Sequence, residues 1–135
     1  MTTVVFLGGG RITSAMLAGL RLGKAKHRLM VHDRNPGKLW DLKKRYRVEV
    51  EPDLDRAVEQ ADVLIVAVRP GSVGKLLGAV EQAIEKLKRP FFRQTFAVSL
   101  AAGVPLRLLS ELVGPPIQWA RAMPSPVCRL SLIHI

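Results

Sequence analysis

The sequence predicts a doubly wound α/β fold, in which a mostly parallel sheet of about six strands lies between two layers of helices. Two observations predict this fold. Short apolar segments alternate along the whole chain with longer segments whose apolar residues recur three and four positions apart. In addition, residues 63–68 form an unbroken apolar run rich in β-branched side chains, which is typical of a strand buried on both faces. Strands of that kind lie in the middle of parallel sheets.

The first strand (4–7) and the first helix (about 11–22) flank a run of three glycines. Gly8 is expected to allow the tight turn after the strand, and Gly10 to let backbone N–H groups at the helix start approach a pyrophosphate. A branched side chain at Gly10 is expected to block that approach and to strain a positive φ there. The third glycine of a GxGxxG pattern is replaced by Thr13, so a simple strand-to-helix turn stays open as an alternative.

The second strand (29–32) ends in Asp33, about 20 residues beyond the glycines, where a carboxylate can bind ribose hydroxyls. Asp33 favours NAD(H) and repels a 2′-phosphate, whereas Arg34 and Asn35 could hold that phosphate. We therefore expect NADP(H) to be preferred and NAD(H) to be accepted. His32 is expected to be a packed or capping residue, and Gly23 to cap the first helix.

A second helix is expected to begin at Asn35-Pro36, and a short edge strand at 48–50 follows it. Asp53 is expected to cap a small third helix. The second helix should pack through one apolar side that contains Leu39, Trp40 and Leu42.

The second half of the chain continues the alternation. Arg69-Pro70-Gly71 ends the buried strand, and a helix at 72–88 shows a clear apolar stripe. Strands are expected at 95–100 and 117–122, the latter after an extended Pro115-Pro116 segment. Between them lies a helix that Pro105 opens and that should bury Leu106, Leu109, Leu112 and Val113.

Length and composition favour a single globular domain. The chain has 135 residues, and no window is apolar enough to span a membrane. The N-terminus lacks the basic region of a secretory signal, so we expect a cytoplasmic protein without a membrane partner. A single cysteine, Cys128, excludes an internal disulfide and a thiolate zinc cluster, and the three histidines lack ligand spacing, so no metal is expected.

The formal charge of +10 raises the question of nucleic acid binding. The basic residues are spread over one loop and two predicted helices, and only 5% of the residues are aromatic, so we expect solvated helix ends rather than a nucleic acid partner. A basic surface could also steer a phosphorylated cofactor toward the protein. The basic groups are Arg21, Lys24, Lys26 and Arg28; Lys38, Lys43, Lys44, Arg45 and Arg47; and Lys86, Lys88, Arg89 and Arg93.

Five motifs stand at the predicted strand ends: Gly8-Gly9-Gly10-Arg11-Ile12, Asp33-Arg34-Asn35-Pro36, Ala67-Val68-Arg69-Pro70, Ser99-Leu100-Ala101-Ala102-Gly103-Val104-Pro105 and Arg121-Ala122-Met123-Pro124-Ser125-Pro126. Together and in this order, they resemble the N-terminal coenzyme domain of the pyrroline-5-carboxylate reductase family. The resemblance covers roughly residues 4–127. It implies a Rossmann-like NAD(P)-binding domain over 1–127, in a three-layer α/β/α arrangement. The candidate cofactor-binding residues are Gly8, Gly10, Arg11 and Ile12; Asp33, Arg34 and Asn35; Ala67, Val68, Arg69 and Pro70; Ala101, Ala102 and Gly103; and Met123 and Pro124.

The resemblance also implies an activity. The family reduces a cyclic imine to proline with NADPH or NADH, and its subunits dimerise through a C-terminal helical domain that supplies much of the substrate site. We therefore expect this chain to be a coenzyme-binding fragment, with the catalytic groups mainly in a missing domain. Residues 128–135 match no family motif and are expected to result from truncation.

The same resemblance assigns positions within the site. Arg69 stands where the family has a basic residue beside the coenzyme, and Ala101, Ala102 and Gly103 match a small-residue loop that leaves room for the nicotinamide. Met123-Pro124 matches a turn at the floor of the active site, but Met123-Pro124-Ser125-Pro126 is one residue shorter than the family pattern and leaves the substrate open. Two alternatives remain: an F420-dependent NADP reductase, and a non-catalytic dinucleotide-binding module.

Overall fold

The computed structural model describes residues 2–24, 26–87 and 95–123, and within them it contains a six-stranded sheet of order β3-β2-β1-β4-β5-β6. Every neighbouring pair of strands is parallel. This is the strand order of the classic dinucleotide-binding fold, so the predicted fold class is confirmed. The strands are β1 (Thr3–Leu7), β2 (Arg28–His32), β3 (Glu49–Val50), β4 (Val63–Val66), β5 (Thr95–Ser99) and β6 (Ile117–Arg121).

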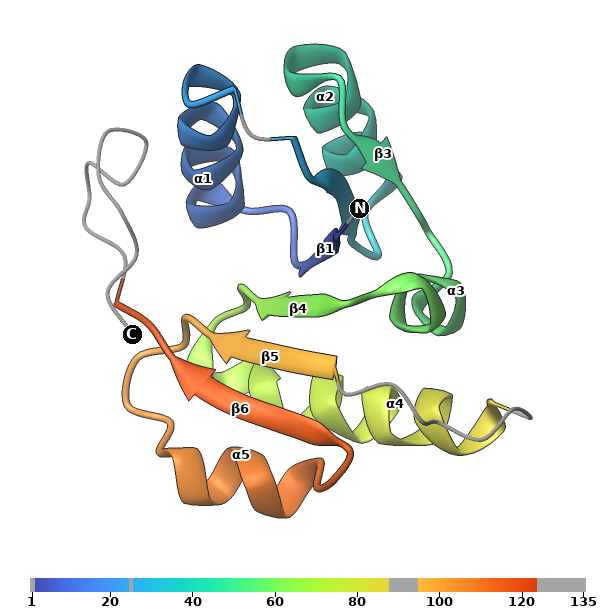
Figure 1. Cartoon of the computed structure of the whole chain (residues 1–135), viewed down its shortest axis with the longest axis vertical. Helices are drawn as coiled ribbons and strands as arrows, with labels where there is room; N and C mark the ends of the chain where they lie inside the picture. The colour runs from blue at the N-terminus through green and yellow to red at the C-terminus, as the bar shows by residue number, and fades with distance from the viewer. Residues whose placement is uncertain (1, 25, 88–94, 124–135) are drawn as a thin grey trace.

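Helices cover both faces of the sheet, with α1 and α2 on one side and α4 and α5 on the other (Figure 1). Side chains of β1 alternate between the two layers, as the period of a strand requires. Phe6 packs with α1 and α2, whereas Val5 and Leu7 pack with α3, α4 and α5. The helices are α1 (Arg11–Leu22), α2 (Pro36–Tyr46), α3 (Leu54–Gln60), α4 (Val73–Lys86) and α5 (Leu106–Leu112), and a 3₁₀ turn, η1 (Pro70–Ser72), precedes α4.

Two helices begin at the caps that the sequence predicts. The side-chain oxygen of Asn35 accepts the backbone N–H of Gly37 at 2.9 Å, at the start of α2. The carboxylate of Asp53 accepts the N–H of Asp55 at 2.9 Å, at the start of α3. Both bonds satisfy N–H groups that have no partner inside the helix, which fixes where each helix begins.

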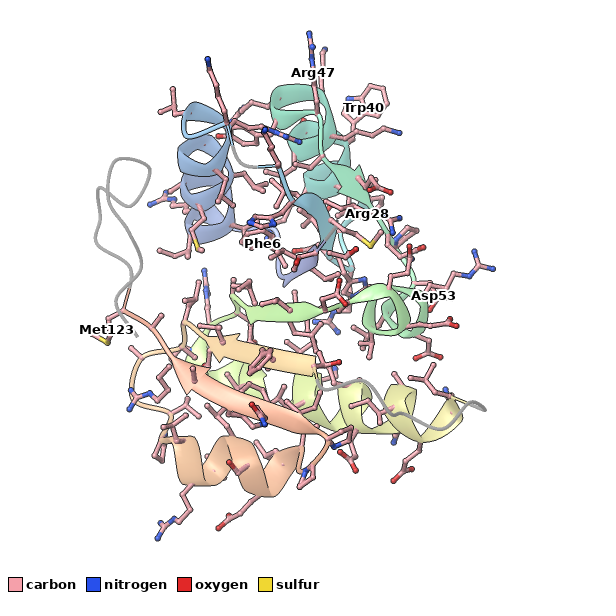
Figure 2. The ribbon with its side chains drawn as sticks, in the orientation of Figure 1. Phe6, Arg28, Trp40, Arg47, Asp53 and Met123 are labelled. Carbon is pink, nitrogen blue, oxygen red and sulfur yellow. The ribbon has the colours of Figure 1, made fainter. Side chains whose placement is uncertain are left out.

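The predicted apolar side of α2 is wrong at one position. Leu39 and Leu42 are buried, but Trp40 is 65% exposed and points outward from α2 (Figure 2). Successive residues of a helix are turned by about 100° from each other, so Leu39 and Trp40 cannot both face the core. Trp40 is therefore a surface residue.

The helix that Pro105 opens also packs differently from the prediction. Leu109 and Val113 are buried, whereas Leu106 is 44% exposed. Leu106 is the first residue of α5, and the helix reaches the core one turn later. Pro115 and Pro116, expected to be extended, form a turn before β6.

Gly23 closes α1 as predicted, but its φ is −77°, and the left-handed residue is the neighbouring Lys24, with φ of 52°. The strand β4 ends at Val66, two residues earlier than expected. The predicted helix end at 88 and the segment 124–135 lie outside the described residues.

His32 is buried, and its Nδ1 lies 2.9 Å from the carbonyl oxygen of Glu51, so its predicted packing role is confirmed. In the described part of the chain, no helix combines the length and the apolar content needed to cross a bilayer. Over the same residues, no three histidine, cysteine or acidic side chains gather into a group that could hold a metal ion.

Candidate functional site

All strands run in the same direction, so their carboxyl ends meet at one edge of the sheet. Backbone hydrogen bonds continue one residue beyond the strands and hold the first residues of the following loops side by side. The chain leaves β1 toward β2 on one side, while β4 lies on its other side, and such a reversal opens a ligand crevice. The bonds run from Gly8 N–H to His32 O (2.9 Å), Ala67 N–H to Leu7 O (2.9 Å), Leu100 N–H to Val66 O (2.9 Å) and Ala122 N–H to Ser99 O (3.0 Å).

The glycine-rich loop begins at Gly8, a position that no residue other than glycine can occupy without strain. Gly8 has φ of +112°, and a Cβ built on it would lie 2.5 Å from the carbonyl oxygen of Ala67. The prediction that Gly8 permits the turn is therefore confirmed. Thr13, at the place of the third glycine, is fully buried, and its Oγ1 donates to the Gly8 carbonyl at 2.5 Å. Thr13 thus ties the first turn of α1 to the end of β1.

Gly10 lies in open space. Its φ is −85°, so a side chain there would not be strained by a positive φ, and no atom lies within 4 Å of a Cβ built there. As the N-cap of α1 it provides no side-chain cap, and the first turn of the helix contains no acidic residue. The free N–H groups and the positive end of the helix dipole therefore remain available for an anion. Arg11 and Ile12, at the start of this helix, are exposed.

At the end of β2, the candidate ribose and phosphate groups are already engaged with the backbone. Asp33 accepts the N–H of Gly9 through Oδ2 at 2.7 Å and the N–H of Asn35 through Oδ1 at 2.8 Å. The Asn35 oxygen caps α2, so only its amide N–H₂ group can donate to a phosphate. Arg34 is exposed beside them.

The loop after β4 joins the same edge. Ala67 and Val68 are half-buried and lie against Gly8, with Val68 Cγ1 3.0 Å from the position of a Gly8 Cβ. Arg69 is exposed, and Pro70 begins η1. The structure thus brings the loops after β1 and β4 into direct contact.

The loops after β5 and β6 complete the edge. Ala101 is buried and donates its N–H to Ser99 Oγ at 3.3 Å, while Ala102 and Gly103 are exposed and Gly103 has φ of +74°. Met123 is 67% exposed at the end of β6 (Figure 2), and Pro124 lies outside the described residues. The described candidate residues all lie at one edge of the sheet, in the loops after the strands or at the starts of α1 and η1. That they bind a cofactor stays a prediction.

The sequence does not predict three residues at this edge as site residues: Gly9 in the loop after β1, Thr13 in α1 and Ser99 at the end of β5. Thr13 carried a signal, because it takes the place of a glycine and its hydroxyl can bond the loop. Gly9 and Ser99 stand inside motifs at strand ends, but the sequence assigns neither a contact. The Gly9 bond joins segments 24 positions apart, which the sequence does not place side by side.

An open hollow and an ion pair lie elsewhere. The hollow is lined by Arg21, Arg45, Tyr46 and Arg47, at the C-terminal ends of α1 and α2, and Arg21 donates to the carbonyls of Tyr46 (2.9 Å) and Arg47 (3.1 Å). These helix ends face the opposite edge of the sheet from the loops described above.

The ion pair joins Arg28 of β2 to Glu49 of β3. A hydrogen bond from Arg28 lowers the pKa of Glu49, and the same bond raises the pKa of Arg28.

The chain is similar to pyrroline-5-carboxylate reductases over most of its length. It is 33% identical to the enzyme of Mycobacterium leprae (strain TN) over 126 residues, which are 93% of this chain and 42% of the relative. It is 26% identical to the enzyme of Corynebacterium melassecola over 126 residues, 93% of this chain and 45% of the relative. The chain therefore spans less than half the length of these curated relatives.

Solved structures agree with this similarity. The pyrroline-5-carboxylate reductase of Coxiella burnetii superposes with a TM-score of 0.79 at 25% identity, covering 94% of this chain and 46% of that one. The Plasmodium falciparum pyrroline carboxylate reductase with NADP bound gives a TM-score of 0.75 at 18% identity, covering 96% and 44%. The second comparison shows the shared fold alone.

Residues 3–89 match the family model described as NADP oxidoreductase coenzyme F420-dependent. The matched segment is more than half of the chain and includes the glycine-rich loop, the end of β2 and the end of β4. By this match, the chain belongs to the family of NADP oxidoreductases, coenzyme F420-dependent.

Proposed function

We propose that the chain is the coenzyme-binding part of an NAD(P)H-dependent reductase of the pyrroline-5-carboxylate reductase type. The observation that carries the proposal is the start of α1, which has no side-chain cap and opens into free space at Gly10. A pyrophosphate fits such a helix start because free N–H groups and the helix dipole favour negative charge. The similarity to the bacterial reductases supports the type of reaction.

Each loop then has a distinct part in binding. The first turn of α1 holds the pyrophosphate through its N–H groups. Arg34, exposed at the end of β2, binds a 2′-phosphate, so that NADP(H) is preferred and NAD(H) is accepted. Arg69, at the end of β4, adds a second cation at the edge where the phosphates lie.

The remaining loops form the wall for the nicotinamide. Ala101, Ala102 and Gly103 present no large side chain, so a flat ring can lie close to the backbone. When bound, the nicotinamide would supply a hydride to the carbon of a cyclic C=N bond, whose nitrogen takes up a proton. The groups that orient the imine lie in the part of the reductase that this chain does not span, and Met123-Pro124 borders that part. We place the whole enzyme in the cytoplasm, as a homo-oligomer that takes a small imine as substrate.

A coenzyme titration tests the proposal. The wild-type chain should bind NADPH, followed by fluorescence, and Gly10→Val should weaken binding at least about tenfold while leaving the thermal unfolding temperature nearly unchanged. Gly78→Val is the matched control, because Gly78 is exposed on α4 and equally free of neighbours. Equal affinity of wild type and Gly10→Val would remove Gly10 from the site, and no binding by the wild type would refute the proposal.

A turnover assay separates the alternatives. The 135-residue chain should not oxidise NADPH in the presence of pyrroline-5-carboxylate, because orientation of the substrate carries much of the rate. Steady turnover would place the whole substrate site within this chain. The name of the matching family model favours one second candidate, an F420-dependent NADP reductase. Oxidation of reduced F420 by NADP⁺ in the presence of the chain would support that candidate.

A non-catalytic dinucleotide-binding module is the other alternative. Coenzyme binding without turnover by this chain agrees with that module as well as with the proposal. The decisive observation is therefore the genomic sequence downstream of codon 127, which would show whether a helical domain is encoded there; a longer form of the protein encoded in that way can then be assayed. Reduction of the imine by that longer form would exclude the non-catalytic module.

A further inference from the structure

Asp33 connects two loops of the candidate site through its carboxylate. Oδ2 accepts the N–H of Gly9, 24 positions earlier in the chain, at 2.7 Å, and Oδ1 accepts the N–H of Asn35 at 2.8 Å. One half-buried side chain thus joins the glycine-rich loop after β1 to the loop that leads into α2.

The fit between Asp33 and Gly9 is close. A Cβ built on Gly9 would lie 3.3 Å from Asp33 Oδ2, 3.5 Å from Asp33 Cβ and 3.2 Å from Leu42 Cδ1. A side chain at position 9 would therefore push Asp33 or Leu42 away. Hydrogen bonds from an N–H group to an ionised carboxylate are also stronger than those between neutral groups.

The position of Gly9 determines what this bond can do. Gly9 directly precedes Gly10, the N-cap of α1, and the N–H groups that would face a pyrophosphate follow at once. Holding the Gly9 peptide therefore fixes the direction in which those groups point. No side-chain cap does this at the start of α1.

The same two hydrogen bonds limit how Asp33 can bind a ribose. A carboxylate accepts about four hydrogen bonds, and two of its acceptor positions face backbone N–H groups. Those two donors also offset the negative charge of the carboxylate. Asp33 therefore repels less strongly the 2′-phosphate of a coenzyme bound by the neighbouring Arg34. The usual link between an acidic residue at the end of β2 and NAD(H) is therefore weakened in this chain.

We propose that Asp33 is a positioning residue that orients the glycine-rich loop for the coenzyme through the Gly9 N–H, rather than a residue that selects the coenzyme through its ribose. The proposal rests on the proposed function, since it takes the coenzyme to bind at this loop. The bond from Gly9 to Asp33 itself can be tested without any coenzyme.

The test uses Asp33→Asn and Asp33→Ala in the full 135-residue chain. Asn can accept only one of the two N–H groups through its oxygen, and Ala accepts neither. Asp62→Asn is the matched control, because Asp62 Oδ2 accepts the N–H of Thr3 at 2.7 Å beside the opposite end of β1. Fluorescence titrations give the affinities for NADPH and NADH, and amide hydrogen exchange followed by NMR reports on Gly9 in the coenzyme-free protein.

Both Asp33 variants should bind NADPH and NADH about tenfold more weakly than the wild type does. The ratio of the two affinities should stay within about twofold of the wild-type ratio. The Gly9 amide should exchange faster in Asp33→Ala, which accepts neither N–H group, while Asp62→Asn leaves the affinities and the Gly9 exchange as in the wild type. If Asp33→Ala fails to fold, the isosteric Asp33→Asn carries the expectation of a common loss of affinity for both coenzymes.

Three results would overturn the proposal. Weaker NADH binding with stronger NADPH binding would make Asp33 a ribose ligand. Unchanged affinities in both Asp33 variants would leave it without a role in binding. An equal loss in Asp62→Asn would show a general loss of stability. If the wild type binds neither coenzyme, the proposed function fails, and unchanged Gly9 exchange in Asp33→Ala, which accepts neither N–H group, would then separately refute the hydrogen bond.

Discussion

Gly8 and Ala67 lie in direct contact across the reversal of strand order: a Cβ on Gly8 would stand 2.5 Å from the carbonyl oxygen of Ala67 and 3.1 Å from its carbonyl carbon. The contact joins the loops after β1 and β4, and the backbone atoms of Ala67 cannot move aside as a flexible side chain could. Thr13 donates to the carbonyl of the same glycine. Three segments of the chain therefore depend on the absence of a side chain at one position.

Gly8→Ala should lower the free energy of unfolding by about 1–3 kcal/mol, because the new Cβ overlaps the backbone of Ala67 and because alanine rarely adopts the positive φ of this position. Gly10→Ala is the matched control, since Gly10 has φ of −85° and no atom within 4 Å of a Cβ. Denaturant unfolding of both variants measures the difference. Equal stability of the two variants would mean that the close approach of Gly8 and Ala67 is absent in solution.

Arg34→Ala should weaken NADPH binding about tenfold or more and leave NADH binding unchanged, because the guanidinium pairs only with the 2′-phosphate. Arg107→Ala removes the same charge from an exposed position on α5 and should change neither affinity. Parallel titrations with both coenzymes give the result. An equal loss for NADPH and NADH would contradict the assignment of Arg34.

Replacement by alanine of two adjacent residues on α2, Leu39 and Trp40, should change the stability of the protein by very different amounts. Leu39→Ala should destabilise the protein by about 2–5 kcal/mol, because the side chain is buried against β1 and β2 residues in the core. Trp40→Ala should change stability by no more than about 0.5 kcal/mol, since Trp40 is 65% exposed. Thermal unfolding of the two variants measures the difference. A large loss of stability in Trp40→Ala would place Trp40 in an interface or in the core.

Glu49 should contribute stability that depends on pH. The hydrogen bond from Arg28, with Nε at 2.5 Å, lowers the pKa of Glu49 below its ordinary value of 4.5. The contribution is therefore present above the ordinary pKa and is lost as the pH falls through the lower, folded-state pKa. Because both side chains are partly exposed, its size is at most about 1 kcal/mol.

Glu49→Gln should accordingly be less stable than wild type near neutral pH, and the difference should disappear in acid. Urea unfolding from pH 7 down to about pH 3 measures it. Glu85→Gln, exposed on α4, serves as the control with the same loss of charge. A difference between Glu49→Gln and wild type that stays constant down to the lowest pH would show that the ion pair is not its source.

Much of the fold could be predicted because it depends on local rules. Asn35 and Asp53 cap the helices that follow them, and the unbroken apolar run that contains β4 required a central strand. The errors have an equally local origin. Apolar residues that are adjacent in a helix, such as Leu39 and Trp40, compete for one side, and only the packed structure decides between them.

The site could be predicted as a set of loops but not as a set of contacts. The motifs placed Gly8 and Asp33 at strand ends, and parallel strands bring such ends to one edge. The sequence does not show that Asp33 already binds two backbone N–H groups, nor that Gly10 adopts a negative φ while Lys24 adopts a positive one. The Gly9 bond arises only when segments 24 positions apart in the chain approach each other.

The place of β1 in the sheet has a consequence for how the protein is made. Val4 lies between Leu29 of β2 and Val63 of β4, so β1 is flanked on both sides by strands that the ribosome makes after it. One hydrogen-bonding edge of this apolar strand stays without its partner until β4 has been synthesised, and pairings between distant segments form slowly. A nascent chain that stops before Val63 therefore exposes that edge to other chains, and translation through β4 is the step that protects it.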